Sequence, residues 1–383
     1  MEFRDLKKQY QVLEKQMNEA VHEVMLDANY ISGRQVTELE KALADYVGVK
    51  HCITCANGTD ALSLALMAWD IGPGDAVFVP DFTFFSSGEV VSFEGATPVF
   101  VDVEEDTFNI SPDSLQEAIE KVIQEGRLIP KVVIAVDLFG QPANYDQIVS
   151  IVRKYNLKLL EDGAQGFGGA IRGKKACSFG DISTTSFFPA KPLGCYGDGG
   201  AVFTDDESIA QLLYSLRVHG KGEDKYDNVR IGMNSRLDTL QAAVLQVKLK
   251  AFIDYELDDI NRIAARYSNM LEQAVKVPVV RTEFLSSWAQ YSILLKDKAE
   301  RDGLQNFLKQ QNIPSMIYYR KPMHLQKAFE QDDCIKVDLS VTRDLCNRVL
   351  SLPIHPYLQI HDQDTVIDAV KQFISRYQDG SII

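Results

Sequence analysis

A single lysine lies in a loop of aromatic residues, prolines and glycines. Lys191 belongs to residues 186–200, which read SFFPAKPLGCYGDGG. Surface lysines are usually surrounded by polar residues, whereas these neighbours indicate a partly buried amine on a tight, glycine-shaped loop. Burial lowers the pKa of an amine because it disfavours the charged form. An uncharged amine can form a Schiff base with a carbonyl, although a structural lysine at a turn would fit the same residues.

An acidic residue follows a predicted buried strand about thirty residues earlier. The apolar residues 157–160 predict the strand, and the glycines from position 163 predict a loop. Ligands bind at this end of the strands in open α/β sheets. Asp162 there could keep the pyridine nitrogen of pyridoxal 5'-phosphate (PLP) protonated, and Gln165 could donate to the oxygen of the ring. A helix N-cap or a turn would also account for Asp162.

A third segment combines a glycine and a hydroxyl with the start of a predicted helix. Residues 55–66 read CANGTDALSLAL and follow the strand-like residues 51–54. The free amides at a helix N-terminus bind phosphate. Gly58 would let the backbone approach the phosphate, and Thr59 would add a hydroxyl. Taken alone, the segment fits an ordinary capped helix equally well.

The three segments, in this order, resemble the DegT/DnrJ/EryC1/StrS family of sugar-nucleotide aminotransferases, which are fold type I PLP enzymes. The resemblance implies an α/β fold with a mostly parallel sheet, helices on both faces and a small C-terminal α+β domain. It implies an EC 2.6.1 aminotransferase whose PLP alternates with pyridoxamine phosphate, and no metal. Further similar segments are residues 3–6, 30–33, 80–84, 95–103, 137–142, 234–243 and 352–358.

The resemblance also assigns roles to individual residues. Lys191 would hold the cofactor as a Schiff base and transfer protons, and Asp162 would face the pyridine nitrogen. Family members that dehydrate sugars have histidine at the lysine position, so Lys191 favours amination. The other cofactor contacts that the resemblance implies are Gly58, Thr59 and Ser186 at the phosphate, Phe84 stacked on the ring, and Gln165 at the ring oxygen.

Some of the implied residues act across a subunit interface. The resemblance predicts a homodimer in which Asn234 reaches the cofactor phosphate of the partner subunit and Arg236 reaches its substrate. Tyr30, Tyr318 and Tyr319 are predicted to contact the substrate. Without the family, a salt bridge at a helix end would be the preferred interpretation of Arg236.

The segments around Lys191 and Arg236 are most similar to one subgroup of the family. Its members transfer an amino group from glutamate to the C3 ketone of UDP-2-acetamido-2-deoxy-3-oxoglucuronate, for bacterial surface polysaccharides such as O-antigen. This chain has Tyr318 where the subgroup has histidine, and Arg320 where it has proline. Arg320 and Lys321 could pair with a uronate or diphosphate, or lie in a solvated loop.

The predicted reaction is a two-stage transamination in which one pocket admits glutamate and then the nucleotide sugar. Two alternatives remain open from the sequence. One is an aminotransferase of another 3-keto or 4-keto nucleotide sugar, including 6-deoxy sugars. The other is a PLP-binding regulatory protein without turnover, against which the set Lys191, Asp162 and Asn234 argues. A dinucleotide-binding fold is disfavoured because no GxGxxG follows the first strand.

Alternating strand-like and helical segments are expected to position these residues. A helix over residues 6–27 precedes alternating segments to about residue 255, which predict a parallel sheet covered on both faces. A charged helix over 237–270 then leads to a small α+β part with strands at 289–295 and 315–319 and a helix at 362–377. The predicted domains are residues 1–255, which bind PLP, and residues 256–383.

Composition narrows the class of protein. The chain has 383 residues and a net charge of −14, which argues against non-specific nucleic-acid binding. We find no signal peptide and no apolar run long enough to span a bilayer, so the prediction is a cytoplasmic protein without a membrane partner. Cys52 and Cys55 have CxxC spacing but no second pair completes a zinc site, so we interpret them as core thiols.

Overall fold

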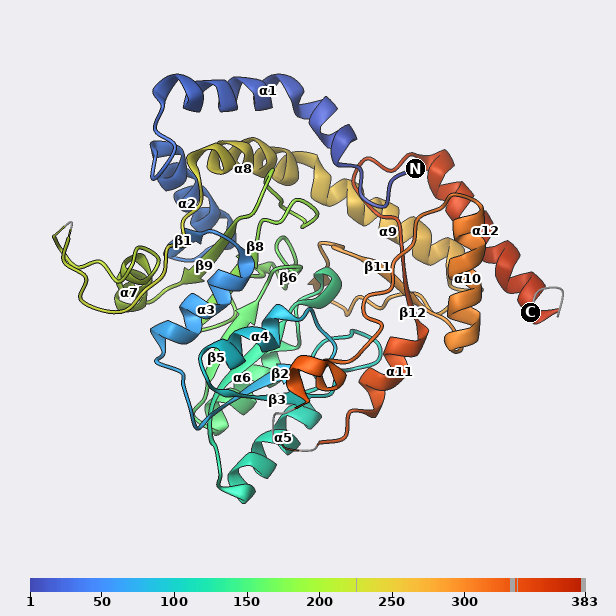
Figure 1. The fold of residues 1–383 in the computed structure, drawn as a ribbon. Coiled ribbons are helices and arrows are strands. Elements are labelled where there is room, and N and C mark those ends of the chain that lie inside the picture. Colours follow the sequence, from blue (N-terminus) through green and yellow to red (C-terminus); the bar gives the residue numbers. More distant parts are fainter. Residues whose placement is uncertain (225, 331–334, 336, 380–383) are drawn as a thin grey trace.

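A mostly parallel sheet forms the centre of the molecule (Figure 1). The structure is a computed structural model that describes residues 1–224, 226–330, 335 and 337–379. Within these residues the sheet has seven strands in the order β1-β9-β8-β5-β4-β2-β3, and only β9 runs antiparallel to its neighbours. The strands are β1 (His51–Cys55), β2 (Asp75–Pro80), β3 (Thr97–Val101), β4 (Ile129–Val136), β5 (Lys158–Asp162), β8 (Ile182–Ser186) and β9 (Gly200–Thr204).

Continuous apolar runs explain why these strands lie inside the protein. Residues 132–136 of β4 and 76–80 of β2 are buried without interruption, as expected for strands covered on both faces. Their carboxyl ends, together with those of β5 and β8, meet at one edge of the sheet. The predicted α/β fold is therefore confirmed, and the residues that follow the strands are brought together.

Helices cover both faces of the sheet (Figure 1). Contacts place α3, α4 and α7 on one face, and α2, α5 and α6 on the other, with α8 against α2 and α1 against α8. The helix predicted over residues 6–27 is α1, whose first turn is capped by the Asp5 side chain, which accepts from the Lys8 amide at 2.8 Å. The bounds are α1 (Leu6–Asp27), α2 (Arg34–Val47), α3 (Gly58–Ala68), α4 (Ser86–Phe93), α5 (Pro112–Glu125), α6 (Tyr145–Lys154), α7 (Glu207–Leu216) and α8 (Thr239–Ala251).

The C-terminal part has its own small sheet and helices, seen in orange and red in Figure 1. The helix predicted over 237–270 is continuous over residues 239–271, with a π-helical turn (Phe252–Glu256) between α8 and the next helix. The strand predicted at 315–319 is wrong: Met316 makes only an isolated bridge to Ser351. The domain boundary after residue 255 stays a prediction. The elements are α9 (Leu257–Leu271), β11 (Tyr291–Leu294), α10 (Lys298–Gln310), α11 (Ser340–Arg348), β12 (Val349–Leu352) and α12 (Ile360–Gln378).

Short elements connect the larger ones. They are a three-stranded sheet of β10 (Phe284–Leu285), β6 (Ala170–Ile171) and β7 (Lys174–Lys175), and 3-10 turns at Leu138–Gly140, Met323–Leu325 and Lys327–Phe329.

The cysteines of the described residues are buried and free. Cys52 and Cys55 lie at β1, and burial raises the pKa of Cys55 to about 12, which fits core thiols. Cys334 lies outside the described residues. Across the described ranges we find no group of side chains suited to a metal ion, and no helix that combines the length and the apolar character needed to cross a membrane.

Candidate active site

A cavity of about 790 Å³ opens at the carboxyl edge of the sheet. The end of β4, the loops after β2, β5 and β8, the start of α3 and the segment before the 3-10 turn at 323–325 contribute to its walls. Nine of the twelve residues predicted for the site line it. They are Gly58, Thr59, Phe84, Asp162, Gln165, Ser186, Lys191, Tyr318 and Tyr319.

Lys191 and Asp162 provide the reactive amine and the buried carboxyl. Burial lowers the pKa of Lys191, while the charge of Asp162 acts in the opposite direction. Burial raises the pKa of Asp162, which is 4% exposed, but the hydroxyl of Ser87 donates to its Oδ2 at 2.9 Å and the Ala164 amide to its Oδ1 at 3.2 Å. These donors favour the ionised carboxylate, the form that can face a protonated pyridine nitrogen.

The N-terminus of α3 forms an anion-binding corner of the cavity. The side chain of Asn57 caps the helix by accepting from the Asp60 amide at 2.8 Å. The amides of Gly58 and Thr59 precede Asp60 and are not used by this cap. A Cβ on Gly58 would lie 2.7 Å from the Cβ of Ser186, so only glycine allows β8 and α3 to approach this closely. The corner therefore combines backbone amides with two hydroxyls.

A hydrogen-bonded pair fixes the far wall of the cavity. Gln165 accepts from the Phe139 amide at 3.0 Å and donates through Nε2 to the hydroxyl of Tyr319 at 3.2 Å. Burial raises the pKa of that hydroxyl, so it is neutral. The side-chain amide nitrogen of Gln165 carries two hydrogens, and only one of them is donated to Tyr319. The second hydrogen can be donated to a ligand. The tyrosine contact was missed from the sequence, since 154 residues separate the two side chains.

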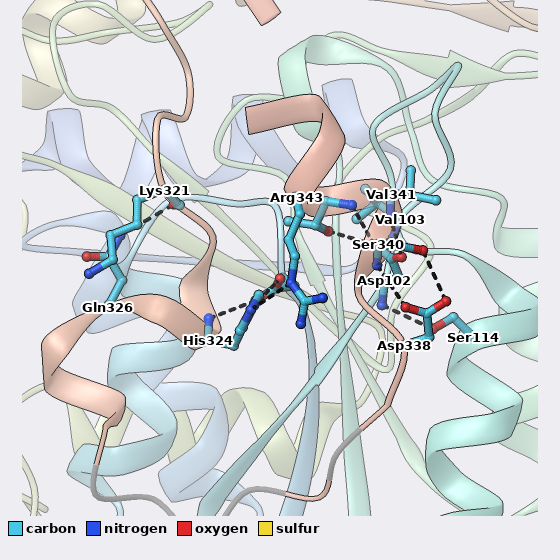
Figure 2. A network of polar contacts seen from close by, with 12 residues as sticks. Asp102, Val103, Ser114, Lys321, His324, Gln326, Asp338, Ser340, Val341 and Arg343 are labelled. Atoms are coloured by element: carbon cyan, nitrogen blue, oxygen red, sulfur yellow. Dashed lines mark hydrogen bonds and ion pairs between the residues drawn. The ribbon is translucent and has the colours of Figure 1, made fainter. Parts of the chain in front are cut away.

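Two buried carboxylates anchor the C-terminal part of the chain. One holds the segment just after Tyr318 and Tyr319, and the other holds the start of α11. Asp81, directly after β2, accepts from the backbone amide of His324 at 2.8 Å and lies 2.6 Å from its Nδ1. Asp102, directly after β3, accepts from the amides of Val341 and Thr342 (Figure 2). His324 therefore has a structural position in this contact. Asp81 and Asp102 could have been identified from the sequence in the same way as Asp162, because each is an acidic residue at the end of a predicted buried strand. Their structural role was nevertheless missed.

Arg320 and Lys321 do not line the cavity. The guanidinium of Arg320 is exposed and donates to the side chain of Gln305 at 2.9 Å. The sequence left two interpretations of Arg320 and Lys321, pairing with the substrate or a solvated loop. The contacts within this one chain favour the solvated loop.

Three predicted residues lie away from the cavity of their own chain. Asn234 is exposed and bridges Val218, and Arg236 lies two residues farther along. Tyr30 lies beside the same segment, because its carbonyl accepts from the Thr239 amide at 2.9 Å. Tyr30, Asn234 and Arg236 thus belong to one strip of surface.

Comparisons with known proteins agree with this geometry. The sequence model of the DegT/DnrJ/EryC1/StrS aminotransferase family matches residues 11–371. The chain belongs to this family. Its members use PLP, and a structural relative at 33% identity, DesV from S. venezuelae, was solved in complex with a ketimine intermediate; its TM-score is 0.91 and the match covers 98% of each chain. The chain is thus a PLP-dependent sugar aminotransferase with the predicted fold type I architecture.

Relatives that are similar to this chain have been given different functional names. The chain is 41% identical to the UDP-2-acetamido-2-deoxy-3-oxo-D-glucuronate aminotransferase of Pseudomonas aeruginosa, over 94% of this chain and 96% of that protein. It is 37% identical to a pleiotropic regulatory protein of Geobacillus stearothermophilus, over 97% and 98% of the two chains. A crystal structure of a family aminotransferase from Brucella abortus has a TM-score of 0.95 at 50% identity, over 97% and 99% of the two chains.

The cavity fits PLP in three respects. It contains an amine of lowered pKa, a buried carboxyl and a helix N-terminus with a glycine that a side chain could not replace. When bound, PLP would supply an electron sink for the electron pair left behind when a proton is removed from the carbon next to the transferred nitrogen.

Proposed function

We propose that this aminotransferase acts on a nucleotide sugar, transferring an amino group from glutamate to the C3 ketone of UDP-2-acetamido-2-deoxy-3-oxoglucuronate. The observation that carries the proposal is the Lys191–Asp162 pair in a cavity of about 790 Å³, in a chain similar over most of its length to the Pseudomonas aeruginosa enzyme of that name. A cavity of this size suits a ligand much larger than glutamate. The product would enter a bacterial surface polysaccharide.

Each residue of the cavity has a proposed task. Lys191 holds PLP and transfers the proton, because its partly buried amine favours the neutral form. Asp162 holds the pyridine nitrogen, Gln165 the ring oxygen, and Gly58, Thr59 and Ser186 the phosphate. Phe84, whose side chain is 54% exposed, supplies a free face for the ring. Tyr318 and Tyr319 orient the sugar.

Charge supports a site shared between two subunits. Among the described residues that line the cavity, Lys191 is the one basic side chain, whereas Asp60, Asp162 and Asp198 are acidic. A nucleotide sugar carries a diphosphate, and the uronate adds a carboxylate, so further cations are required. We propose that Arg236 of the partner subunit supplies one, with Asn234 at the phosphate and Tyr30 at the sugar.

A spectrum of the purified protein with PLP tests the proposal. We expect a visible band that disappears with glutamate and returns with the 3-keto UDP-uronate, and no such band in the Lys191→Ala variant. A band that glutamate leaves unchanged would contradict turnover and support a regulatory protein. A band restored only by a 4-keto or 6-deoxy sugar would keep the reaction and replace the substrate.

A second substrate class has a specific observation in its favour. The chain is 37% identical to the dTDP-3-amino-3,6-dideoxy-alpha-D-galactopyranose transaminase of Aneurinibacillus thermoaerophilus, over 97% and 99% of the two chains. Such a sugar lacks the carboxylate at C6. Comparing kcat/KM for a uronate and a matched 6-deoxy sugar, both with a 3-ketone, separates the two substrates.

A further inference from the structure

The N-terminal segment contacts the loop that carries the reactive lysine. The Nη2 atom of Arg4 donates to the backbone carbonyl of Lys191 at 2.9 Å, across 187 residues of sequence. Within the loop, the Lys191 amide donates to the carbonyl of Phe188 at 2.8 Å. The main chain at Lys191 is therefore held on both sides, by its own turn and by Arg4.

The guanidinium of Arg4 has no carboxylate bonded to it among the described residues. Its Nη1 atom is shielded from solvent and lacks a hydrogen-bond partner within the described part of the chain. Glu256, in the π-helical turn, is the acid that acts on it, but the Gln9 amide and the Tyr357 hydroxyl donate to this carboxylate at 2.8 and 2.5 Å. Arg4 thus brings a positive charge that is not directly neutralised to the back of the Lys191 loop.

Other charged groups also act on the amine of Lys191, and the charge of Asp162 has a larger effect on it than the charge of Arg4. Asp162 favours the charged amine of Lys191, and Arg4 opposes it. On the far side of Arg4, burial lowers the pKa of Lys248 to about 8 and that of His355 to about 4, and the Arg4 charge adds to both effects. The imidazole is therefore neutral at physiological pH. Glu256 opposes the effect of Arg4 at Lys248, and Asp5 and Asp362 oppose it at His355.

We propose that Arg4 is a positioning residue for Lys191: it fixes the main chain from which the lysine projects, and its charge favours the neutral amine. A cationic neighbour is a general way to activate an amine as a nucleophile. The inference rests on the proposed role of Lys191 in holding PLP and extends it to a residue outside the cavity.

Recombination of the apo protein with PLP tests the inference without measuring turnover. The rate of appearance of the visible band is measured as a function of pH for the wild type, Arg4→Met and Arg4→Lys. Arg262→Met, at an exposed arginine paired with Asp259, is the matched control. Only the neutral amine reacts, so the midpoint of the profile reports the pKa of Lys191.

We expect Arg4→Met to move this midpoint to higher pH. Below the midpoint, recombination should then be slower by about tenfold for every pH unit that separates the variant's midpoint from that of the wild type. Arg4→Lys keeps the charge, so its midpoint should stay near that of the wild type, while its plateau rate falls because the loop is held less well. Arg262→Met should match the wild type.

Three outcomes would overturn the inference, and the third is distinguishable from the first two. A wild-type profile in folded Arg4→Met protein, or the same upward displacement of the midpoint in Arg4→Lys as in Arg4→Met, contradicts the role of Arg4 alone. Absence of the band in the wild type overturns the proposed function and the inference with it. Circular dichroism and urea unfolding establish that each variant is folded.

Discussion

Asp137 and Glu161 form a buried pair of carboxyl groups next to Asp162. Glu161 accepts from Ser183 and from the amides of residues 177, 179 and 180, whereas Oδ1 of Asp137 accepts from Tyr145 and the Ala143 amide. Burial raises the pKa of both carboxyls, and the charge of Glu161 adds to the cost of ionising Asp137. The shared proton of the pair is therefore assigned to Asp137.

This pair makes the free energy of unfolding depend on pH. The folded pKa of Asp137 lies above its unfolded value, near 3.9, so the folded state binds more protons and loses stability as pH rises from there toward the folded pKa. Asp137→Asn, whose amide can donate to Glu161, should remove this fall and add about 1 kcal/mol at neutral pH. Urea unfolding at a series of pH values measures the free energy of unfolding of each variant. Asp146→Asn, at an exposed residue, is the control. An unchanged slope in Asp137→Asn would contradict the assignment.

At the residue scale, the sequence identified the groups whose chemistry is unusual for their surroundings. Lys191 among aromatic residues and Asp162 after an apolar strand both carried such a signal. Ser87 and Arg4 carried none, because a serine within a helix and a charge near an N-terminus are common. Their importance comes from contacts with residues 75 and 187 positions away, which the spacing of a single sequence does not contain.

At the scale of elements, the contact between α3 and β8 sets the phosphate corner. Gly58→Ala would place a methyl group 2.7 Å from the Cβ of Ser186, which forces the helix and the strand apart. We expect PLP affinity to fall about tenfold or more, at a cost of about 1–3 kcal/mol for the added atoms. Equilibrium titration of the apo protein with PLP measures the effect.

Gly72→Ala is the matched control, since the nearest atom to its added Cβ would be 3.8 Å away. Equal affinities for the two alanine variants would show that the close approach at Gly58 is not required.

The anchors of the C-terminal segment should control substrate binding. Asp81→Ala removes both side-chain contacts to His324, so the segment of Tyr318 and Tyr319 is held less firmly, while Lys191 and Asp162 keep their positions. We expect the KM for the sugar to rise about tenfold, with a smaller change in kcat, from the loss of about 1–2 kcal/mol. Steady-state kinetics measure this split.

Asp338→Ala, at an exposed residue of the same network, is the control for this experiment (Figure 2). A fall confined to kcat in the Asp81 variant would place the effect on the chemistry rather than on binding.

Periodicity predicted the elements that bury one continuous apolar face. The helix at residues 6–27 and the strands at 51–54 and 157–160 agree closely with α1, β1 and β5. The strand expected at 315–319 failed because residues such as Tyr318 and Tyr319 face a cavity, which needs aromatic side chains but no strand partner. The π-helical turn was missed because inserting one residue into a helix turn leaves its composition unchanged.

At the scale of the whole molecule, the strip of Tyr30, Asn234 and Arg236 predicts complementation between two inactive variants. Lys191→Ala and Arg236→Ala should each lose most of their activity as homodimers. After the subunits are mixed and exchanged, half of the dimers are mixed, and each has one intact shared site. Activity should then recover to about a quarter of the wild-type value.

The same mixture made with Lys191→Ala and Asp162→Ala is the control, because both residues lie in one cavity and no intact site can form. Failure to recover activity in the first mixture, with subunit exchange demonstrated by a tagged chain, would contradict the shared site. The sequence could suggest this arrangement only through resemblance, since a single chain contains no contact with its partner.

The position of Arg4 has a consequence for the order in which the protein acquires its site during synthesis. Residues near the N-terminus leave the ribosome first, yet Arg4 lies in a small cavity bounded by Lys191, His355 and Tyr357. Domains often fold while the chain is still being made. Arg4 is made before these three residues, so the contacts behind the lysine loop are completed only after residue 357 has been made.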